Sequence, residues 1–395
     1  MRKKRLFFAQ DVRVLEKDDK IIVGNIRIDG RWIKLQKDIF EYITYLVLED
    51  NILEKIDTFD KEEKNYYKDV IQKLYDIHVL VEEEKQIAFT SLSIDVTTRC
   101  NLRCKHCCIS CGEIPDVDLS KEDCIKLIKW SEENGITHIT FSGGEIFLHP
   151  HILEILKYAH DNFQGKISII TNATLLNKEL ADFLATNIDD VSVSLDGYNE
   201  KSVDNIRGMG VFSIVEKNIY MLKKSNVKHI SATMVLTDEN EKHIHDFECM
   251  CSRMGIEPAL RTLNVSGRAL ENYKELQKMD NFNYTVVQEN LTMKSVCYAG
   301  LNTLSIDAHG NVIPCVALNT QWTIGKIEEL LNRKLKAFTK NLCLVEQHPI
   351  CNKCNVRYFC SDLCAAINES IYNNETIRLD RCHKIKDYYE MVVWR

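Results

Sequence analysis

Three features that mark other classes of protein are missing from this sequence of 395 residues. No apolar run reaches the roughly 18 residues that a membrane-spanning helix needs. The basic N-terminus, MRKKRLFF, is followed at once by acidic and polar residues, not by the apolar core of a signal peptide. The formal net charge is −7, which argues against a nucleic-acid-binding protein. These absences predict a cytoplasmic protein with neither a membrane nor a nucleic acid as partner.

Cysteine, in contrast, is abundant, with 16 residues. In a cytosolic chain of this size, clustered cysteines bind metal more often than they form disulfides. The length allows two or three domains, and a hydrophobic content of 45% supports a sizeable core. The pattern along the chain divides it into residues 1–90, 91–280 and 281–395.

Residues 1–90 are predicted to form a small α+β domain. Two β-rich runs in 12–25 surround a charged turn at Asp18-Asp19, which is typical of a hairpin. Helical patterns follow near Phe40 and over 61–76, and the run HVLVEEE ends the domain as a short strand. This order of hairpin, helices and strand is that of a winged helix.

Residues 91–280 alternate strand-like and helical patterns, and this alternation predicts a parallel α/β sheet. The apolar runs cover 91–97, 137–143, 166–172, 190–196, 229–236 and 258–263. Six such units favour an open, partial (β/α)6 barrel similar to a TIM barrel. Ser120 is the expected N-cap of a helix over 121–134 that Gly135 ends. From residue 297 onward the chain is expected to be loop-like.

A cysteine motif directly follows the first of these strands. Cys100, Cys104 and Cys107 have the spacing C-x3-C-x2-C, which allows a short loop to place three thiolates around one 4Fe–4S cluster. In this motif the chain resembles the radical S-adenosylmethionine (radical SAM) superfamily. The resemblance implies an iron left open for S-adenosylmethionine, whose cleavage yields a 5′-deoxyadenosyl radical. His106 stands where the family usually has an aromatic residue. A zinc site or a chance spacing is the alternative.

Further residues of the resemblance stand at the ends of the later strands, where parallel α/β folds bind ligands. The sequence Gly143-Gly144-Glu145 looks like the family motif that contacts the methionine amino group. The other implied contacts, to the ribose and the methionine carboxylate, are Asn172, Ser194 and Arg207. The loop 266–268 is expected near the adenine. For Arg207 and Arg268 a solvated surface arginine is the alternative, and no residue is assigned as catalytic.

Seven cysteines near the C-terminus have the layout C-x12-G-x4-C, gap, C-x2-C-x5-C-x3-C, gap, C, which resembles a SPASM domain. The resemblance implies two auxiliary 4Fe–4S clusters and so three in all. One cluster would use Cys351, Cys354, Cys360 and Cys382, and the other Cys297, Cys315 and Cys364. The second set leaves either an open iron or a place for Cys343. A zinc ribbon is the alternative. Cys124 and Cys249 are expected in the core, and Cys108 and Cys111 are expected to be bystanders on the cluster loop.

A winged-helix-like unit before a radical SAM core resembles the leader-recognition domain of enzymes that modify ribosomal peptides. The implied function is an oxidoreductase that abstracts hydrogen from a precursor peptide and closes a crosslink, expected to be a cysteine thioether to carbon. The partners would be a leader-bearing precursor and a flavodoxin- or ferredoxin-type reductant. A structural extension or a DNA-binding winged helix is the alternative for the first domain.

Three other functions remain open at this point. A carbon–carbon crosslink requires the same steps. A sulfatase-maturing formylglycine synthase shares the core, but its catalytic aspartate follows the cysteine at the position of Cys315, where this chain has Val316. A non-catalytic iron–sulfur electron carrier belongs to another class. The identity of the peptide, the residues joined and the oligomeric state are not determined by the sequence.

Overall fold

The computed structural model describes residues 5–9, 11–26, 30–48, 52–82, 89–264, 266–276, 291–293, 299–300, 302–318, 322–333, 346, 349–359 and 375–395. The chain forms two compact units, and neither is a single continuous segment. The first, here called the N-terminal unit, joins Met1–Gln86 with Asn283–Tyr298 and Asn341–Arg395. The second, here called the sheet unit, joins Ile87–Phe282 with Ala299–Lys340. Segments from both ends of the chain therefore contribute to the N-terminal unit.

The N-terminal unit contains the predicted hairpin, helices and short strand, together with β1 (Phe7–Phe8), β4 (Trp32–Gln36) and α2 (Ile52–Ile56), which the sequence did not predict. Its other strands in this region are β2 (Val12–Lys17), β3 (Lys20–Asn25) and β5 (Leu80–Val81). Its other helices in this region are α1 (Lys37–Leu48) and α3 (Lys61–Asp76). Strands β2, β3 and β4 form an antiparallel sheet in that order, and β1 pairs with β5. The predicted hairpin turn at Asp18-Asp19 is confirmed, because Lys17 pairs with Lys20. The predicted helix over 61–76 is also confirmed.

A second core in this unit joins residues far apart in the sequence. Leu15 and Ile22 from the hairpin pack with Phe359 and with Trp394 of helix α15 (Glu375–Trp394). The indole Nε1 of Trp394 donates to the carbonyl of Asn355 at 3.1 Å. The face of the hairpin turned away from α1 and α3 is therefore covered by the C-terminal segment.

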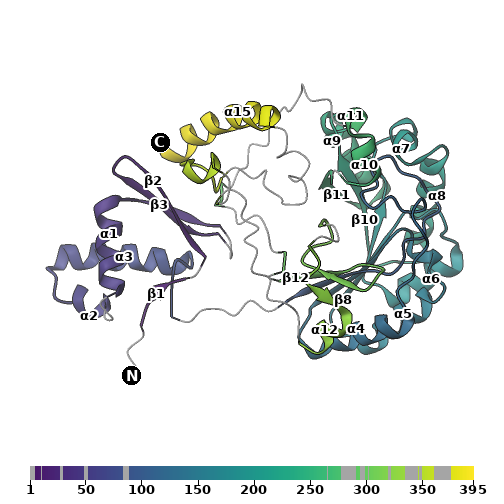
Figure 1. Cartoon of the computed structure of the whole chain (residues 1–395), viewed down its shortest axis with the longest axis horizontal. Coiled ribbons are helices and arrows are strands. Elements are labelled where there is room, and N and C mark those ends of the chain that lie inside the picture. Colours follow the sequence, from purple (N-terminus) through teal and green to yellow (C-terminus); the bar gives the residue numbers. More distant parts are fainter. Residues whose placement is uncertain are drawn as a thin grey trace. The chain divides into compact units, whose positions relative to one another are not determined.

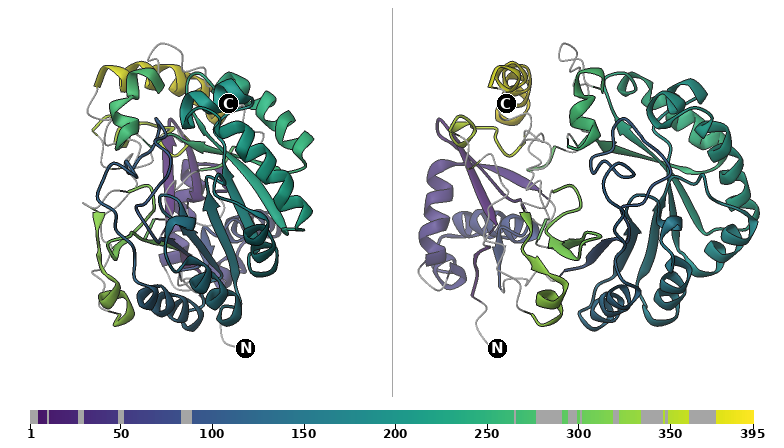
Figure 2. Two further views of the ribbon diagram at one scale, coloured as in Figure 1. Left: turned by 90° about the vertical axis from the view of Figure 1, so that its right-hand side faces the viewer. Right: turned by 45° about the vertical axis from the view of Figure 1, so that its right-hand side comes forward.

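The sheet unit contains the six predicted parallel strands, in sequence order. They are β6 (Ser91–Asp95), β7 (His138–Ser142), β8 (Lys166–Thr171), β9 (Asp190–Ser194), β10 (His229–Leu236) and β11 (Glu257–Thr262). Between them lie α4 (Lys121–Glu133), α5 (Ile152–Asn162), α6 (Lys178–Asn187), α7 (Glu200–Arg207), α8 (Val211–Lys224) and α9 (Ile244–Met254). Figures 1 and 2 show these helices wrapped around the outer face of a curved, open sheet. The predicted cap of α4 is confirmed, since the Ser120 side chain accepts from the Asp123 amide.

The expectation of loops after residue 297 is wrong for part of that region. Strand β12 (Thr303–Ile306) pairs in parallel with β6, and β13 (Asn311–Ile313) and β14 (Gly325–Lys326) continue the sheet before α12 (Ile327–Leu331). These strands have two to four residues, too few to show a clear alternation of apolar and polar positions. The first predicted strand, β6, is therefore an interior strand of a nine-stranded sheet.

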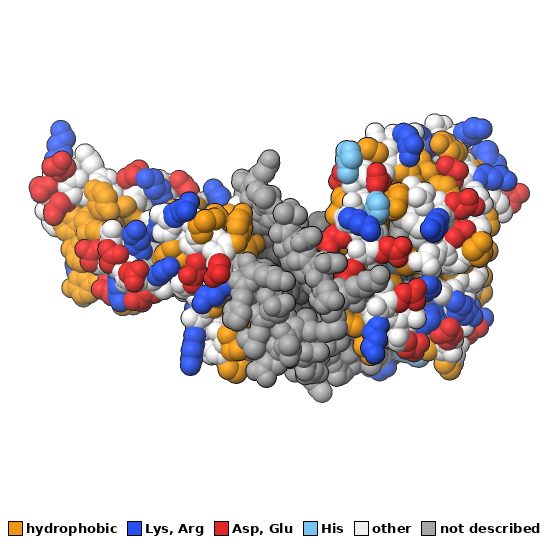
Figure 3. All heavy atoms as spheres, turned by 90° about the horizontal axis from the view of Figure 1, so that it is seen from above, with side chains coloured by type: hydrophobic (Ala, Val, Ile, Leu, Met, Phe, Trp, Pro, Cys, Tyr) orange, Lys and Arg blue, Asp and Glu red, His pale blue; other side chains and the backbone are white. Residues whose placement is uncertain are grey.

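No helix in the described part of the chain is long and apolar enough to cross a membrane. In the view of Figure 3 acidic and basic side chains are interspersed over the visible surface of both units. This mixture agrees with the modest negative net charge and shows no basic face on the described surface in that view.

Candidate functional site

The face of the sheet that points away from the helices is polar. Leu92 and Ile94 of β6 are fully buried in the core that the strands share with the outer helices, so Ser93 and Asp95 face the opposite side. The register of the parallel strands extends this alternation across the sheet. The polar inward-facing residues include Ser91, Ser93, Asp95, His138, Thr140, Ser142, Asp190, Ser192, Ser194, Ser231 and Thr233. A parallel sheet buried on both faces would be apolar throughout, so this face is suited to a polar ligand.

The loop that begins at Cys100, here called the cluster loop (residues 100–113), starts at the carboxyl end of β6. The Leu102 amide donates to the Cys100 Sγ at 3.5 Å, and Arg207 Nη1 donates to the Cys104 Sγ at 3.8 Å. Burial raises the pKa of the Cys100 and Cys104 thiols. A hydrogen bond from the Cys111 thiol is the main cause that lowers the pKa of Cys107. The loop thus presents three sulfur atoms, and each of them has at least one N–H donor directed at it.

Gly143 and Gly144 let two backbone segments meet at the base of this loop. Gly143 has φ +140°, and a Cβ on Gly144 would lie 2.2 Å from the carbonyl oxygen of Arg99. The Gly144 amide donates to the Thr97 carbonyl at 2.8 Å, and the Glu145 amide to the Arg99 carbonyl at 2.7 Å. The glycines are therefore required for contact between the motif and the backbone just before Cys100, a role that the resemblance did not suggest.

The Glu145 side chain joins this motif to the next strand. Glu145 is fully buried, and its carboxylate accepts from the Thr171 hydroxyl at 2.8 Å and from the Asn172 amide at 2.7 Å. Burial raises the pKa of Glu145, and these hydrogen bonds oppose the rise. The Asn172 side chain donates in turn to Asn101 Oδ1 of the cluster loop at 2.9 Å. Two residues predicted to contact the ligand, Glu145 and Asn172, thus lie in one buried network.

Asp196, directly after β9, forms the centre of a second buried network. Its carboxylate is 2.6 Å from His106 Nε2 and forms an ion pair with Arg207, which also reaches the Cys104 sulfur. Burial opposes ionisation of Asp196, but the charges of Arg207 and His106 outweigh it and hold the pKa of the carboxyl well below its usual range. No contact of Asp196 was predicted from the sequence. The sequence feature that could have indicated its role is an acidic residue at a strand end, two positions after Ser194, which was predicted to contact the ligand.

Two nitrogen atoms of this network have no hydrogen-bond partner in the described residues. They are His106 Nδ1 and Arg207 Nε, and both are buried. The hydroxyl of the half-buried Ser194 makes no hydrogen bond within the described part of the chain either. Because buried polar atoms are nearly always hydrogen-bonded, these nitrogens are suited to a polar ligand. Arg207 and Arg268 are both buried, so the alternative of a solvated surface arginine is wrong for each.

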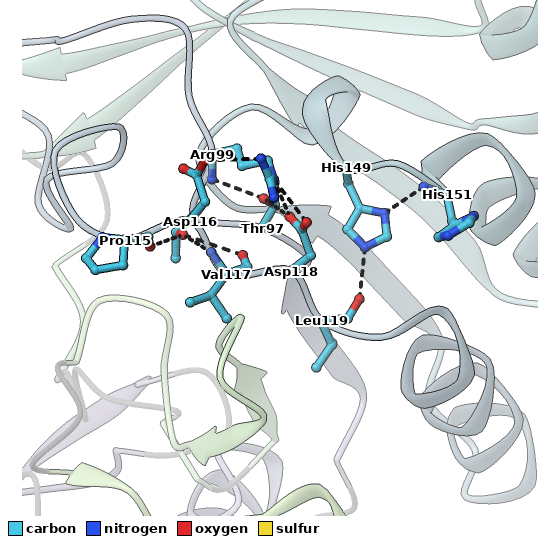
Figure 4. Close-up of polar contacts among 10 residues, drawn as sticks. Thr97, Arg99, Pro115, Asp116, Val117, Asp118, Leu119, His149 and His151 are labelled. Carbon is cyan, nitrogen blue, oxygen red and sulfur yellow. Dashed lines mark hydrogen bonds and ion pairs between the residues drawn. The ribbon is translucent and has the colours of Figure 1, made fainter.

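Arg99, just before the cluster loop, binds the segment that follows the loop and returns to α4, as Figure 4 shows. Its Nε is 3.0 Å from Asp118 Oδ2, and its Nη1 is 3.1 Å from Asp116 Oδ2. The return segment of the loop is also fixed at its end, where the imidazole of His149 contacts the carbonyl of Leu119 at 2.8 Å. These contacts hold the segment from the loop to α4 against the end of β6.

Among the described C-terminal cysteines, three belong to the N-terminal unit. Cys351 begins the single turn η4 (Cys351–Lys353), and Cys354 follows it. Both cysteines are partly buried against the second core of this unit, which contains Phe359 and Trp394. Burial raises the pKa of Cys354, and the negative charge of Cys382, on α15, adds to the rise. Cys315 lies in the sheet unit, where its Sγ accepts from the Ala317 amide at 3.5 Å. Four cysteines lie outside the described residues: Cys297, Cys343, Cys360 and Cys364.

None of the twelve described cysteines forms a disulfide. The described side chains also include no group of three or more that could hold a single metal ion. This finding does not conflict with a cubane cluster, because each cysteine of a 4Fe–4S site binds a different iron and the sulfurs do not converge on one point.

The predictions for the remaining cysteines are confirmed in part. Cys124 is fully buried, as expected. Cys249 is exposed, so the expectation of a core position is wrong, and Cys251 is the buried cysteine of α9. The buried positions of α9 include Met250 and Met254, which place Cys249 on the opposite side of the helix.

Residues 94–248 match the family model of the radical SAM superfamily. The sheet unit contains a radical SAM domain. The cluster loop and the predicted residues from Gly143 to Arg207 all fall inside the matched range. The match covers less than half of the chain, so it says nothing of the first 93 residues or of the C-terminal cysteines.

Among curated proteins, the chain is 25% identical over 313 residues to the antilisterial bacteriocin subtilosin biosynthesis protein AlbA of Bacillus subtilis. That alignment covers 72% of this chain and 69% of AlbA. The mycofactocin maturase MftC of Mycobacterium ulcerans is 30% identical over 186 residues, which are 47% of this chain and 50% of MftC. The radical SAM domain is thus homologous to those of peptide-modifying maturases, and the chain spans about half the length of MftC.

Among solved structures, Streptococcus suis SuiB bound to S-adenosylmethionine superimposes with a TM-score of 0.57 at 16% identity, over 93% of this chain and 97% of SuiB. Native anSMEcpe with bound AdoMet gives a TM-score of 0.52 at 19% identity, over 75% of this chain and 99% of that one. At these identities the likeness shows a shared fold, a radical SAM α/β fold with a mostly parallel central sheet.

Proposed function

We propose that this chain is a radical SAM maturase of a ribosomally synthesised peptide. One observation carries the proposal: a loop with three cysteines at the end of β6 is held by the Gly143–Glu145 backbone and by two buried polar networks. The relationship to AlbA and MftC supports a peptide as the substrate.

Cys100, Cys104 and Cys107 would hold a 4Fe–4S cluster, which supplies the electron that cleaves S-adenosylmethionine. The chain itself contributes donors to the ligand sulfurs. The Leu102 amide and the Arg207 guanidinium are directed at Cys100 and Cys104, and such donors favour the thiolate over the thiol. Thiolates are the ligand form for iron–sulfur clusters, so the loop fits the group.

Four residues provide the chemistry to bind S-adenosylmethionine. Glu145 makes three hydrogen bonds within the protein, and a carboxylate has about four acceptor sites, so one remains for an ammonium. Arg207 Nε is an unpartnered buried donor suited to a carboxylate. Ser194 offers a hydroxyl on the polar face, and Asn172 orders the loop beside it through Asn101.

We propose two auxiliary clusters on the C-terminal cysteines, as the SPASM resemblance implies. Cys351, Cys354 and Cys382 all belong to the N-terminal unit, which supports their assignment to one ligand set. Cys360 would complete this first set, and Cys297, Cys315 and Cys364 would form the second. An open iron in the second set is proposed to bind the thiolate of the substrate, unless Cys343 fills the position.

The N-terminal unit is proposed to bind the leader as an added strand. Its sheet has two edges, β2 and β4, because β3 lies between them. In an antiparallel ladder alternate residues direct both backbone groups outward. Counting from the hairpin pair Lys17–Lys20, the outward residues are Val12, Val14 and Glu16 on β2 and Trp32, Lys34 and Gln36 on β4, with Val14 and Lys34 at the middle of each edge.

The two edges differ in what already occupies them. The carbonyl of Val14 accepts from Arg357 Nη2 at 3.5 Å, whereas the backbone of Lys34 has no bond beyond the sheet within the described residues. The proposed leader site is therefore the β4 edge around Lys34, beyond the start of the strand, where the segment 291–293 already binds Gly30 and Trp32. Proline at Ile21–Val23 would not test this proposal, because β3 is the central strand and these residues are buried.

A matched pair of variants tests the leader site. Lys34→Pro removes the outward N–H of β4, while Lys34→Ala removes only the side chain. We expect Lys34→Pro to weaken precursor affinity at least about tenfold, the equivalent of one to two backbone hydrogen bonds, and Lys34→Ala to bind within about threefold. Equal affinity of the two variants for the precursor would contradict an added strand.

The function itself is tested with anaerobically reconstituted protein. The expected result is about twelve irons per chain, from three clusters of four, and reductive cleavage of S-adenosylmethionine to 5′-deoxyadenosine. With the precursor peptide, the product should lose two hydrogen atoms in mass. A product cysteine that no longer reacts with an alkylating reagent indicates a thioether, and one that still reacts indicates a carbon–carbon crosslink. Iron without cleavage would indicate an electron carrier instead.

A sulfatase-type substrate provides a separate control. Val316 follows Cys315 and is 47% exposed, and it has no group that could accept a proton from a substrate. We expect no conversion of a sulfatase-derived cysteine or serine peptide to formylglycine. Conversion at a rate similar to that of the precursor would favour the formylglycine synthase.

A further inference from the structure

A short segment after β11 binds the backbone of the cluster loop from a distance of about 160 residues in the sequence. The Ser266 hydroxyl donates to the Cys108 carbonyl at 2.8 Å, and the Asn272 side chain donates to the Lys105 carbonyl at 3.1 Å. The segment 266–272 therefore contacts the loop at several carbonyls rather than at one point.

Gly267 shows how closely the two segments approach. A Cβ on this residue would lie 2.7 Å from the carbonyl oxygen of Cys108, and its φ is +52°. A side chain at this position would clash with backbone atoms and strain the conformation as well. The close approach places the next residue, Arg268, over the loop.

Arg268 makes more contacts to the loop than any other residue of this segment. Its Nε donates to the Cys104 carbonyl at 3.1 Å, and Nη1 and Nη2 donate to the Cys111 carbonyl at 3.2 and 3.1 Å. Nη1 is also 2.8 Å from the Glu113 carboxylate, which is half exposed. The Arg268 side chain is only 7% exposed. One guanidinium thus joins two loop residues that are seven positions apart and lie on either side of Cys107.

We propose that Arg268 is a positioning residue that fixes the spacing of the cluster cysteines by clamping the carbonyls of Cys104 and Cys111. The inference rests on the proposed function only in that the loop is taken to hold a cluster. The planar guanidinium has five N–H donors in a fixed arrangement, so it can serve both carbonyls at once. A lysine has the same charge but a single nitrogen on a flexible stem, and it cannot reproduce both contacts.

The first measurement uses cluster-free protein, so it does not depend on iron. Amide hydrogen exchange over 104–113 is compared in wild type, Arg268→Lys and the control Glu113→Gln, which leaves the carbonyl contacts intact. We expect exchange in Arg268→Lys to be at least about fivefold faster, the equivalent of one lost hydrogen bond, and exchange in Glu113→Gln to stay within about twofold of wild type. An amide exchange rate over 104–113 in Arg268→Lys equal to that of wild type would overturn the proposal.

The second measurement uses reconstituted protein. The electron paramagnetic resonance signal of the reduced cluster, normalised to bound iron, should broaden in Arg268→Lys and remain sharp in Glu113→Gln, because loosened carbonyls allow several cluster geometries. A sharp, unchanged signal in Arg268→Lys would mean that charge alone is sufficient and that the clamp is wrong. If wild type binds no iron, the proposed function fails, while the exchange experiment still decides the clamp.

A milder variant covers the case in which Arg268→Lys does not fold. Ser266→Ala removes the hydrogen bond from the Ser266 hydroxyl to the Cys108 carbonyl and leaves the Arg268 guanidinium in place. Faster exchange confined to the amides near Cys108 would support control of the loop by segment 266–272. Unchanged exchange there would contradict it.

Discussion

The two compact units differ in how far apart in the sequence their core residues lie. In the sheet unit, the strands from β6 to β11 each pair with a neighbour one strand–helix repeat away, and most of the core grows repeat by repeat, whereas β12 joins β6 from far along the chain. In the N-terminal unit, Leu15 and Ile22 share a core with Phe359 and Trp394, more than 300 residues later. The first kind of core can be predicted from local periodicity, and the second cannot.

The largest expected difference between the units concerns cleavage of S-adenosylmethionine. Cys104→Ala removes a proposed ligand in the sheet unit and should abolish cleavage. Cys354→Ala removes one in the N-terminal unit and should retain most of the cleavage while losing peptide modification. The measurement is 5′-deoxyadenosine formation beside product mass. Equal loss of cleavage in both variants, with the fold intact, would contradict separate roles.

The next effect tests the shared core of the N-terminal unit. Phe359 is fully buried and packs edge-on against Trp32 at 5.3 Å between ring centroids. Phe359→Ala should destabilise this unit by about 3–5 kcal/mol, as large-to-small core substitutions do, and leave the unfolding of the sheet unit unchanged. Denaturation followed by hydrogen exchange in each unit measures this effect. Deleting residues 1–86 would expose the same core, so a point variant is the cleaner test.

A somewhat smaller effect is expected in the sheet unit at Asp196. Asp196→Asn leaves the buried Arg207 without its counter-charge, which should destabilise the unit by about 3 kcal/mol. The control is Asp116→Asn, whose ion pair with Arg99 is exposed and therefore contributes little to stability. Urea unfolding measures both variants. A similar small loss in both would show that the Asp196 network does not stabilise the fold.

Asp95 predicts a pH dependence specific to the sheet unit. Burial raises the pKa of this carboxyl to about 7, and the neighbouring Asp307 adds to the rise. The folded state therefore holds its proton up to about pH 7, whereas the unfolded state loses it near pH 4. The free energy of unfolding should fall as pH rises through this range, by up to about 1.4 kcal/mol per unit. Asp95→Asn should remove that part of the slope, and an unchanged slope would assign it to other groups.

The smallest expected effect is at a helix end in the sheet unit. The Ser120 side chain caps α4 by accepting from the Asp123 amide at 3.0 Å. Ser120→Ala should cost about 1 kcal/mol, and Ser120→Asp, which keeps an acceptor, should restore stability. The midpoint of urea unfolding measures both changes. A loss of stability in Ser120→Asp as large as that in Ser120→Ala would show that the hydroxyl does not act as a helix cap.

Much of the candidate site could be predicted because its residues follow strands. Cys100, Gly143, Asn172 and Ser194 each stand directly after or at the end of an apolar run, and parallel strands bring such ends together. The networks among them could not be predicted, because they join side chains from different repeats. The exposure of Cys249 and the burial of Arg207 likewise depend on which face of a helix packs inward.

The sequence by itself determined the order of strands and helices, the ends of α3 and α4, the position of the cysteine motif and the class of domain that holds it. These are local properties, set by periodicity, caps and spacing. The tertiary structure alone decided that β12 covers the edge of β6, that the C-terminal helix completes a core begun by the first hairpin, and that Arg268 lies over the cluster loop. The physical reason is that each of these contacts joins segments far apart in the sequence, and no local pattern of residues indicates that they will meet. Their association depends on which apolar surfaces remain exposed once the local helices and strands have formed.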